Sequence, residues 1–258
     1  MQKFITVDKK DHILLITLKR PEVRNALSTM LLLELQAIIS SIKLSDTRCL
    51  IITGSGDKAF CSGADLKERS SMSSVETLDF LNLIGSTFNL LANLPIPTIA
   101  LINADAFGGG LELALACDLR ITHEQVLLGL TETSLGIIPG AGGTQRLSRL
   151  IGVSRALDMI LCAKKISGQE AFDISLVNYL VPKEQLLLFA YELAHKISNN
   201  GPLSLAAAKN AVINGLDISL KEGLELERNA YKSILLSQDR KEGINAFLQK
   251  RQALFIGK

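Results

Sequence analysis

The residues best suited to proton-transfer chemistry are two isolated glutamates beside glycine-rich turns. Glu112 is the only charged residue in the apolar segment 111–117, directly after three glycines at 108–110. Glu132 stands among uncharged residues, ahead of a loop rich in glycine and proline. A carboxyl group in an apolar setting has a raised pKa, because burial disfavours its charged form. Two such groups can act as general acid and general base near neutral pH.

The glycines beside Glu112 could also present backbone N–H groups to a reacting oxygen. The triplet opens a short apolar helix, and the first N–H groups of a helix have no partner within it. A second turn, Ser62-Gly63-Ala64, follows an extended segment and can expose N–H groups in the same way, since glycine permits sharp turns. Paired N–H donors stabilise an oxygen that becomes negative during a reaction. The combined pattern indicates proton transfer beside a carbonyl group.

Each glutamate also has an ordinary structural interpretation. Glu112 could point to solvent from its helix, and this is as consistent with the segment as a buried position. Glu132 could be a carboxylate in the first turn of a helix, where the helix dipole favours negative charge. The catalytic interpretation therefore requires both glutamates to lie beside the two glycine turns.

Other short motifs fit poorly with the sites that they suggest. Gly54-Ser55-Gly56 follows an apolar run, but the next residues are extended, whereas a dinucleotide-binding turn must open a helix. The loop at 140–144 lacks the Lys-Ser or Lys-Thr ending of a P-loop, and no G-x-S-x-G elbow occurs. The four cysteines and three histidines lack metal-ligand spacing. We expect no metal, and reduced thiols in a cytoplasmic compartment.

The overall composition is that of a globular protein. The chain has 258 residues, of which 47% are hydrophobic and 21% are charged, with a net charge of +2. This length allows one large domain or two small ones. The near-neutral charge provides no strong field for nucleic acid or membrane surfaces. No run of 18 apolar residues is present to form a membrane helix.

The hydrophobic pattern predicts an α/β fold. Strands and helices alternate along the first three quarters of the chain, and the last quarter is helical throughout. Short apolar runs predict strands within 4–18 (two strands), 49–53, 98–102, 119–122 and 176–181. Helical spacing predicts helices at 28–42, 74–94, 111–116, 144–162, from 171, and at 184–198, 203–214, 219–235 and 239–250. We expect an α/β core over 1–195 and a helical region over 196–258.

At these motifs the sequence resembles the crotonase superfamily, the enoyl-CoA hydratase/isomerase family. The resemblance runs from Arg20-Pro21 and Asn25-Ala26-Leu27 to Phe247-Leu248-Gln249-Lys250-Arg251, and its most specific parts are the glycine-triplet helix and the loop 139–147. It implies a crotonase-like spiral of ββα units with a C-terminal helical trimerisation region. It also implies self-association as a trimer or a dimer of trimers.

The resemblance assigns roles to individual residues. The oxyanion hole would be the backbone N–H groups of Ala64 and Gly109, and Glu112 and Glu132 match the two catalytic glutamates of the hydratases. The acyl-CoA would contact Asn25, Ala26, Ala64, Asp65, Leu66, Lys67 and Gly108, with Lys67 near the phosphates and Phe247 and Lys250 closing over the CoA. No cofactor and no metal are implied, because CoA is part of the substrate.

Both acidic positions are glutamate, as in an enoyl-CoA hydratase that adds water to a 2-enoyl-CoA in fatty-acid β-oxidation or branched-chain amino-acid breakdown. The segments 63–69 and 110–118 look most like methylglutaconyl-CoA hydratase, which also binds AU-rich RNA. That hydratase and an enoyl-CoA isomerase remain alternatives, as does a non-catalytic RNA-binding member. We do not expect RNA binding, because residues 201–258 contain nine basic and six acidic residues, an ordinary surface balance. No membrane partner is expected.

Overall fold

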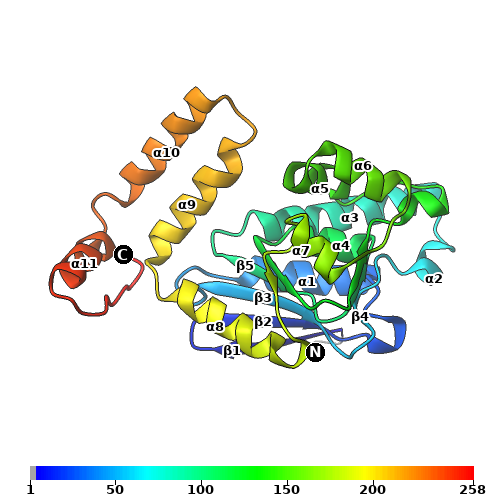
Figure 1. The fold of residues 1–258 in the computed structure, drawn as a ribbon, viewed down its shortest axis with the longest axis horizontal. Coiled ribbons are helices and arrows are strands. Elements are labelled where there is room, and N and C mark those ends of the chain that lie inside the picture. Colours follow the sequence, from blue (N-terminus) through cyan, green and yellow to red (C-terminus); the bar gives the residue numbers. More distant parts are fainter. Residues whose placement is uncertain (1–3) are drawn as a thin grey trace.

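The computed structural model describes residues 4–258 and shows an α/β core followed by a helical C-terminal extension (Figure 1). A six-stranded sheet has the order β1-β2-β3-β5-β7-β10, and only its β1–β2 pair is antiparallel. Its strands are Ile5–Lys10, Ile13–Leu18, Cys49–Gly54, Thr98–Leu101, Leu119–Thr122 and Tyr179–Leu180. The predicted α/β class is therefore confirmed.

A second sheet of very short strands lies beside the first and has the order β4-β6-β8-β9. Its strands are Ala59–Cys61, Asp105–Phe107, Leu127–Gly129 and Ile166–Ser167. Along the chain, successive units place one strand in each sheet before a helix follows: β3 and β4, then β5 and β6, then β7 and β8. This is the expected spiral of ββα units.

The main sheet is covered on both faces, which explains its continuous apolar strands. All six residues of β3 are buried. Leu50 and Ile52 belong to the hydrophobic cluster formed with α1 (Thr29–Ser41) and α3 (Ser74–Ala92). Cys49 and Ile51 face the other way, into a cluster with α8 (Leu186–Ser198). Alternate side chains of one strand thus pack into two separate cores.

The helices predicted at 28–42 and 74–94 begin next to capping serines, whereas the helix predicted from 171 begins earlier, at Gly168, where Ser167 and Glu170 form a capping box. Ser28 caps α1, and its hydroxyl accepts a hydrogen bond from the Leu31 N–H at 3.3 Å. Ser73 and Glu76 form a capping box at the start of α3. Other helices of the core are α2 (Leu66–Arg69), α4 (Gly109–Leu115), α7 (Gly168–Asp173) and the 3₁₀ segments Pro21–Val23, Glu132–Leu135 and Lys183–Gln185.

The expectation of one continuous helix over 144–162 is wrong. Two helices occupy this region, α5 (Gly143–Ile151) and α6 (Val153–Leu161). Gly152 between them has φ +84°, a backbone conformation that glycine adopts easily and that interrupts a right-handed helix. The strands of the second sheet and the helix α2 were not predicted, because two or three residues cannot show the alternation of a strand and four residues cannot show the period of a helix.

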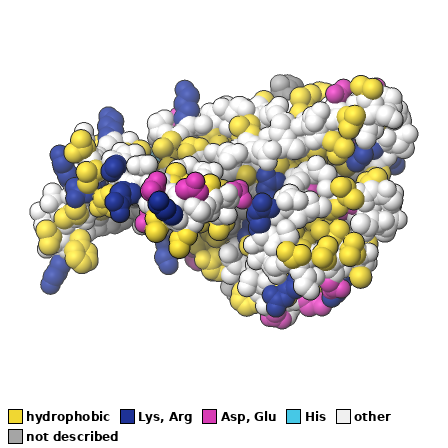
Figure 2. Space-filling view, turned by 90° about the horizontal axis from the view of Figure 1, so that it is seen from above, with side chains coloured by type: hydrophobic (Ala, Val, Ile, Leu, Met, Phe, Trp, Pro, Cys, Tyr) yellow, Lys and Arg dark blue, Asp and Glu magenta, His cyan; other side chains and the backbone are white. Residues whose placement is uncertain are grey.

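The C-terminal helices α9 (Pro202–Gly215), α10 (Leu220–Ile234) and α11 (Gln238–Leu248) extend away from the sheets (Figure 1). The Lys209 ammonium of α9 donates to Asp118 Oδ2 at 2.8 Å and ties this extension to the core. Hydrophobic and basic side chains lie together on its surface (Figure 2); Leu216 and Leu236 are 74% and 84% exposed. The predicted boundary at 195/196 falls inside α8, which packs on the sheet, and this division stays a prediction.

Residues 4–258 lack the features of a membrane span and of a clustered metal site. None of the helices there combines the length and hydrophobicity needed to cross a bilayer. Within the same range, no group of three or more His, Cys, Asp and Glu side chains is placed to hold a metal ion.

Candidate active site

Glu112 is buried, with 3% of its surface exposed, so its helix does not present it to solvent. Its Oε1 accepts hydrogen bonds from the backbone N–H groups of Ala141 at 2.8 Å and Gly143 at 2.7 Å. Burial raises the pKa of Glu112, while these two N–H groups and the nearby Arg146 oppose the rise. The carboxylate is thus held in one orientation by the glycine-rich loop, although it lies in an apolar region.

The position of Glu112 depends on close packing between α4 and β4. A Cβ atom on Gly110 would lie 2.0 Å from the carbonyl oxygen of Cys61, a distance that no real side chain tolerates. Glycine is therefore required at this point for the helix to approach the strand. The close approach brings the first turn of α4 beside the turn that follows β4.

Glu132 begins the 3₁₀ segment Glu132–Leu135 and is partly buried. Burial raises its pKa to about 7, and the neighbouring Glu112 adds to this rise. Its Oε2 is buried without a hydrogen-bond partner among the described residues. A carboxyl group with these properties exchanges a proton readily near neutral pH.

The two glycine turns meet beside these glutamates. Gly63 has φ +98° and Gly108 has φ +51°. A Cβ on Gly63 would lie 3.2 Å from the Gly109 nitrogen, and a Cβ on Gly109 would lie 3.6 Å from the Ala64 nitrogen. A Cβ on Gly108 would lie 3.0 Å from Glu132 Oε1. Small residues therefore keep the space between the backbone nitrogens and the carboxyl groups open.

The N–H groups of Ala64 and Gly109 are available to a ligand. Leu27 pairs with Ala64 as an isolated parallel bridge, and its hydrogen bonds use Gly63 O and the Asp65 N–H. The Ala64 N–H is left pointing away from Leu27. Gly109 is the first residue of α4, where helical N–H groups lack intrahelical partners. Within residues 4–258, neither of these two N–H groups donates a hydrogen bond to the protein.

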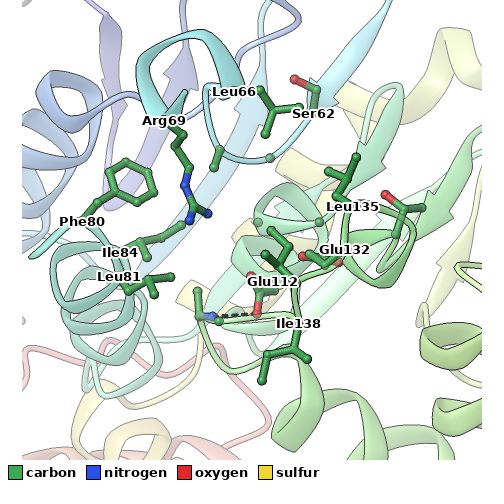
Figure 3. Close-up of a pocket in the computed structure, with 18 residues that line it drawn as sticks. Ser62, Leu66, Arg69, Phe80, Leu81, Ile84, Glu112, Glu132, Leu135 and Ile138 are labelled. Atoms are coloured by element: carbon green, nitrogen blue, oxygen red, sulfur yellow. Dashed lines mark hydrogen bonds between the residues drawn. The ribbon is translucent and has the colours of Figure 1, made fainter. Parts of the chain in front are cut away.

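These groups line one pocket with a mostly apolar wall (Figure 3). The pocket brings together six of the predicted site residues: Ala64, Leu66, Gly108, Gly109, Glu112 and Glu132. Part of the wall was not predicted. Its residues come from α3 and from the segment after Glu132: Phe80, Leu81, Ile84, Leu135, Ile137 and Ile138. The apolar face of the 74–94 helix was visible in the sequence, but nothing there showed what it packs against.

The other predicted CoA contacts lie outside this pocket. Asn25 is fully buried, and its amide group donates to Ser55 O at 2.9 Å and Ala59 O at 2.8 Å. Asp65 caps α2 and accepts a 2.9 Å hydrogen bond from Arg20. These side chains support the turn that contains Ala64. Their contact with CoA stays a prediction, as does that of the neighbouring Ala26.

Lys67 is exposed on α2, next to the pocket. Phe247 is 83% exposed in α11, and Lys250 follows that helix. Within one chain, α11 lies at the opposite end of the molecule from α2 and α4 (Figure 1). The predicted closure of Phe247 and Lys250 over a CoA therefore cannot occur within a single chain in this arrangement.

Two arginines at the site were not predicted. Arg146 of α5 donates to Ala141 O at 3.0 Å and to Asn89 Oδ1 at 2.7 Å, so it holds the loop that binds Glu112. Arg69 lies at the end of α2 and lines the pocket. Arg146 belongs to the 139–147 motif, but its hydrogen-bond partners become apparent only when the loop is folded.

An N–H pair and two carboxyl groups in one pocket define a class of protein that polarises a carbonyl group and transfers protons beside it. Residues 8–258 match the family model described as enoyl-CoA hydratase/isomerase. Bacillus subtilis YngF, itself named for this class, is 50% identical over 96% of both chains. Mouse methylglutaconyl-CoA hydratase is 41% identical, over 95% of this chain and 80% of its own length.

A solved structure agrees closely with this fold. The chain of a Bacillus anthracis enoyl-CoA hydratase matches with a TM-score of 0.98 and 47% identity, covering 99% of this chain and 100% of that one. The protein belongs to the enoyl-CoA hydratase/isomerase family and has the crotonase fold. It is an enzyme of the hydratase/isomerase class.

Proposed function

We propose that the protein is an enoyl-CoA hydratase that adds water across the Cα=Cβ bond of a 2-enoyl-CoA thioester. The observation that supports this best is the placement of Glu112 and Glu132 in one pocket beside the free N–H groups of Ala64 and Gly109. Hydration of an enoyl thioester needs these three functions together: a base for water, an acid for Cα and donors for the thioester oxygen.

The N–H pair would bind the thioester oxygen. As water attacks Cβ, the electrons of the double bond move toward this oxygen, which gains enolate character. Two preorganised N–H donors stabilise that charge, and each lowers the barrier by about 3 kcal/mol. The apolar wall of the pocket excludes bulk water and strengthens the interaction.

The two glutamates would divide the proton transfers. Glu112 accepts two N–H hydrogen bonds that favour its charged form, so we assign it as the base that takes a proton from the attacking water. Glu132 has a pKa raised to about 7 by burial and holds its proton more readily, so we assign it as the acid that protonates Cα. The product is a 3-hydroxyacyl-CoA, and proton exchange with water restores both groups.

Two other acyl-CoA reactions remain candidates because relatives have them in their names. The mouse relative is named methylglutaconyl-CoA hydratase, and this name makes hydration of a methyl-branched enoyl-CoA a candidate reaction for this chain. A Mycosarcoma maydis protein named enoyl-CoA isomerase/hydratase is 43% identical over 94% of this chain. Isomerisation would use the same carboxyl groups without adding water. A non-catalytic RNA-binding role is disfavoured, since such a role has no use for two carboxyl groups in an apolar pocket.

The proposal includes self-association. The exposed hydrophobic residues of α9 and α10, among them Val212, Leu220 and Leu224, favour a trimer or a dimer of trimers, because burying them removes apolar surface from water. In such an assembly α11 could supply Phe247 and Lys250 to the CoA of a neighbouring subunit.

We place the protein in the cytoplasm, since Cys49, Cys61, Cys117 and Cys162 are free thiols, the form that a reducing compartment maintains. Neither a metal nor a separate cofactor enters the proposal.

The first experiment mixes the purified protein with crotonyl-CoA and follows the loss of absorbance from the conjugated thioester. Mass spectrometry identifies the product. A gain in mass of one water supports the hydratase. Unchanged substrate despite tight CoA binding contradicts it, and product of unchanged mass but shifted double bond indicates the isomerase.

A further inference from the structure

Arg69 is the one basic side chain among the described residues that line the pocket. It lies at the end of α2, and its guanidinium points into the pocket beside Phe80 and Ile84 (Figure 3). Its Cζ lies 5.7 Å from the centre of the Phe80 ring, and this cation–π contact places the charge at the apolar wall. Phe80 itself is 3% exposed, so the ring provides a fixed support.

The guanidinium of Arg69 has no anionic partner among residues 4–258. It forms no ion pair and no side-chain hydrogen bond with any of them. The carboxylate of Glu112 is bound instead by two backbone N–H groups, and the cation that acts on it is Arg146. Arg69 is therefore not needed to neutralise the acidic residues of the pocket. Its five donors remain free for a ligand.

The direction of Arg69 separates it from the predicted phosphate contact, Lys67. Side chains two residues apart in a helix point to nearly opposite sides, at about 160° to each other. Lys67 is exposed and does not line the pocket, whereas Arg69 does. The two cations on α2 thus face different regions. Arg69 faces the apolar wall of the pocket, to which Leu81 and Ile84 of α3 contribute.

We propose that Arg69 selects an acyl chain that ends in a carboxylate, so that the preferred substrate is a 2-enoyl-CoA carrying a second acid group. A guanidinium matches a carboxylate through two parallel hydrogen bonds, and it is less strongly hydrated than an ammonium group. A methyl-terminated chain leaves this cation without a partner in the apolar pocket. Hydration of this substrate rests on the proposed hydratase function, whereas binding of its acid group by Arg69 does not depend on that function.

The test compares crotonyl-CoA with glutaconyl-CoA, in which a carboxyl group replaces one hydrogen of the terminal methyl. We expect the wild-type protein to have the higher kcat/KM on glutaconyl-CoA. The R69Q variant should lose about 10–100-fold on glutaconyl-CoA and less than about 3-fold on crotonyl-CoA. R69K should keep part of the preference, because it keeps the charge but loses the two-point geometry.

The control variant is R155Q, which removes one exposed positive charge from α6, away from the pocket. It should change neither rate. Equal losses of R69Q on both substrates would overturn the proposal, since they would indicate a contact with the shared CoA portion or a loss of structure. Equal rates for R69Q and the wild type on glutaconyl-CoA would overturn it as well.

Binding of unreactive analogues separates this proposal from the hydratase assignment. Isothermal titration compares glutaryl-CoA with butyryl-CoA, the saturated counterparts of the two substrates. A preference for glutaryl-CoA that R69Q abolishes supports the role of Arg69 even if neither enoyl-CoA is hydrated. Equal affinity of the wild-type protein for the two analogues contradicts it, whatever the reaction proves to be.

Discussion

The Glu112 carboxylate lies 2.7 Å from the Gly143 amide nitrogen, so the glycine-rich loop holds the side chain that we assign as the base. The contact is short because Gly143 has no side chain. A Cβ there would lie 2.9 Å from both Glu112 Oε1 and Leu130 Cδ1. The backbone of one segment thus fixes the position of a carboxyl group on another element, and its N–H groups oppose the rise in the pKa of Glu112 that burial causes.

We expect Gly143→Ala to displace the carboxylate of Glu112 from its two N–H donors. The kcat for crotonyl-CoA should fall about 10–100-fold, because a small misplacement of a catalytic group is costly. The free energy of unfolding should fall by about 1–3 kcal/mol from overpacking. The matched control is Gly85→Ala in α3, where a Cβ meets nothing within 4 Å. That variant should keep its activity and gain a little stability.

Replacing either glutamate with glutamine should remove most of the activity while leaving the fold intact. Glu112→Gln loses the base for water, and Glu132→Gln loses the acid for Cα. Each kcat should fall about 10²–10⁴-fold. Steady-state kinetics with crotonyl-CoA measures the loss, and circular dichroism with CoA titration checks structure and binding. Ordinary turnover in either variant would remove that residue from the mechanism.

The pH dependence of hydration should report Glu132. This group donates a proton to Cα, so it must be protonated in the free enzyme, and its pKa of about 7 sets the limit. The kcat/KM for hydration should therefore fall as pH rises through about 7. The reverse dehydration needs the ionised form and should rise through the same pKa. A flat hydration profile between pH 6 and 8 would contradict the assignment.

The same pKa predicts that Glu132 destabilises the protein above neutral pH. Its folded-state pKa is raised from 4.5 to about 7, so the folded state binds the proton more tightly than the unfolded state. The resulting loss in the free energy of unfolding is absent below pH 4.5, grows as the pH rises toward 7 and is complete above pH 7. Glu132→Gln should therefore stabilise the protein by about 1–2 kcal/mol at pH 8, after allowance for its partial exposure, and by much less at pH 5. Denaturant unfolding at the two pH values measures this difference.

The main sheet and the long helices could be predicted because each has a local physical signature. The strand at 49–53 reads as buried because both of its faces are covered, and α1 and α3 have capping residues followed by apolar residues at helical spacing. The second sheet has strands of only two or three residues, whose stability comes from pairing with distant segments. The break at Gly152 was missed because the helical period continues across it.

The order of residue types along the chain is enough to show which chemical groups this protein has available. Two glutamates in apolar segments and two glycine turns can be recognised from residue types, because the apolar character of the neighbours and the backbone freedom of glycine are properties of the residues themselves. The folded chain is needed to show that Glu112 is buried and held by Ala141 and Gly143, and that Arg69 reaches the same pocket. Such relationships join segments far apart in the chain. They depend on how α2, α3, α4 and the segment 139–147 pack together, which no local sequence pattern indicates.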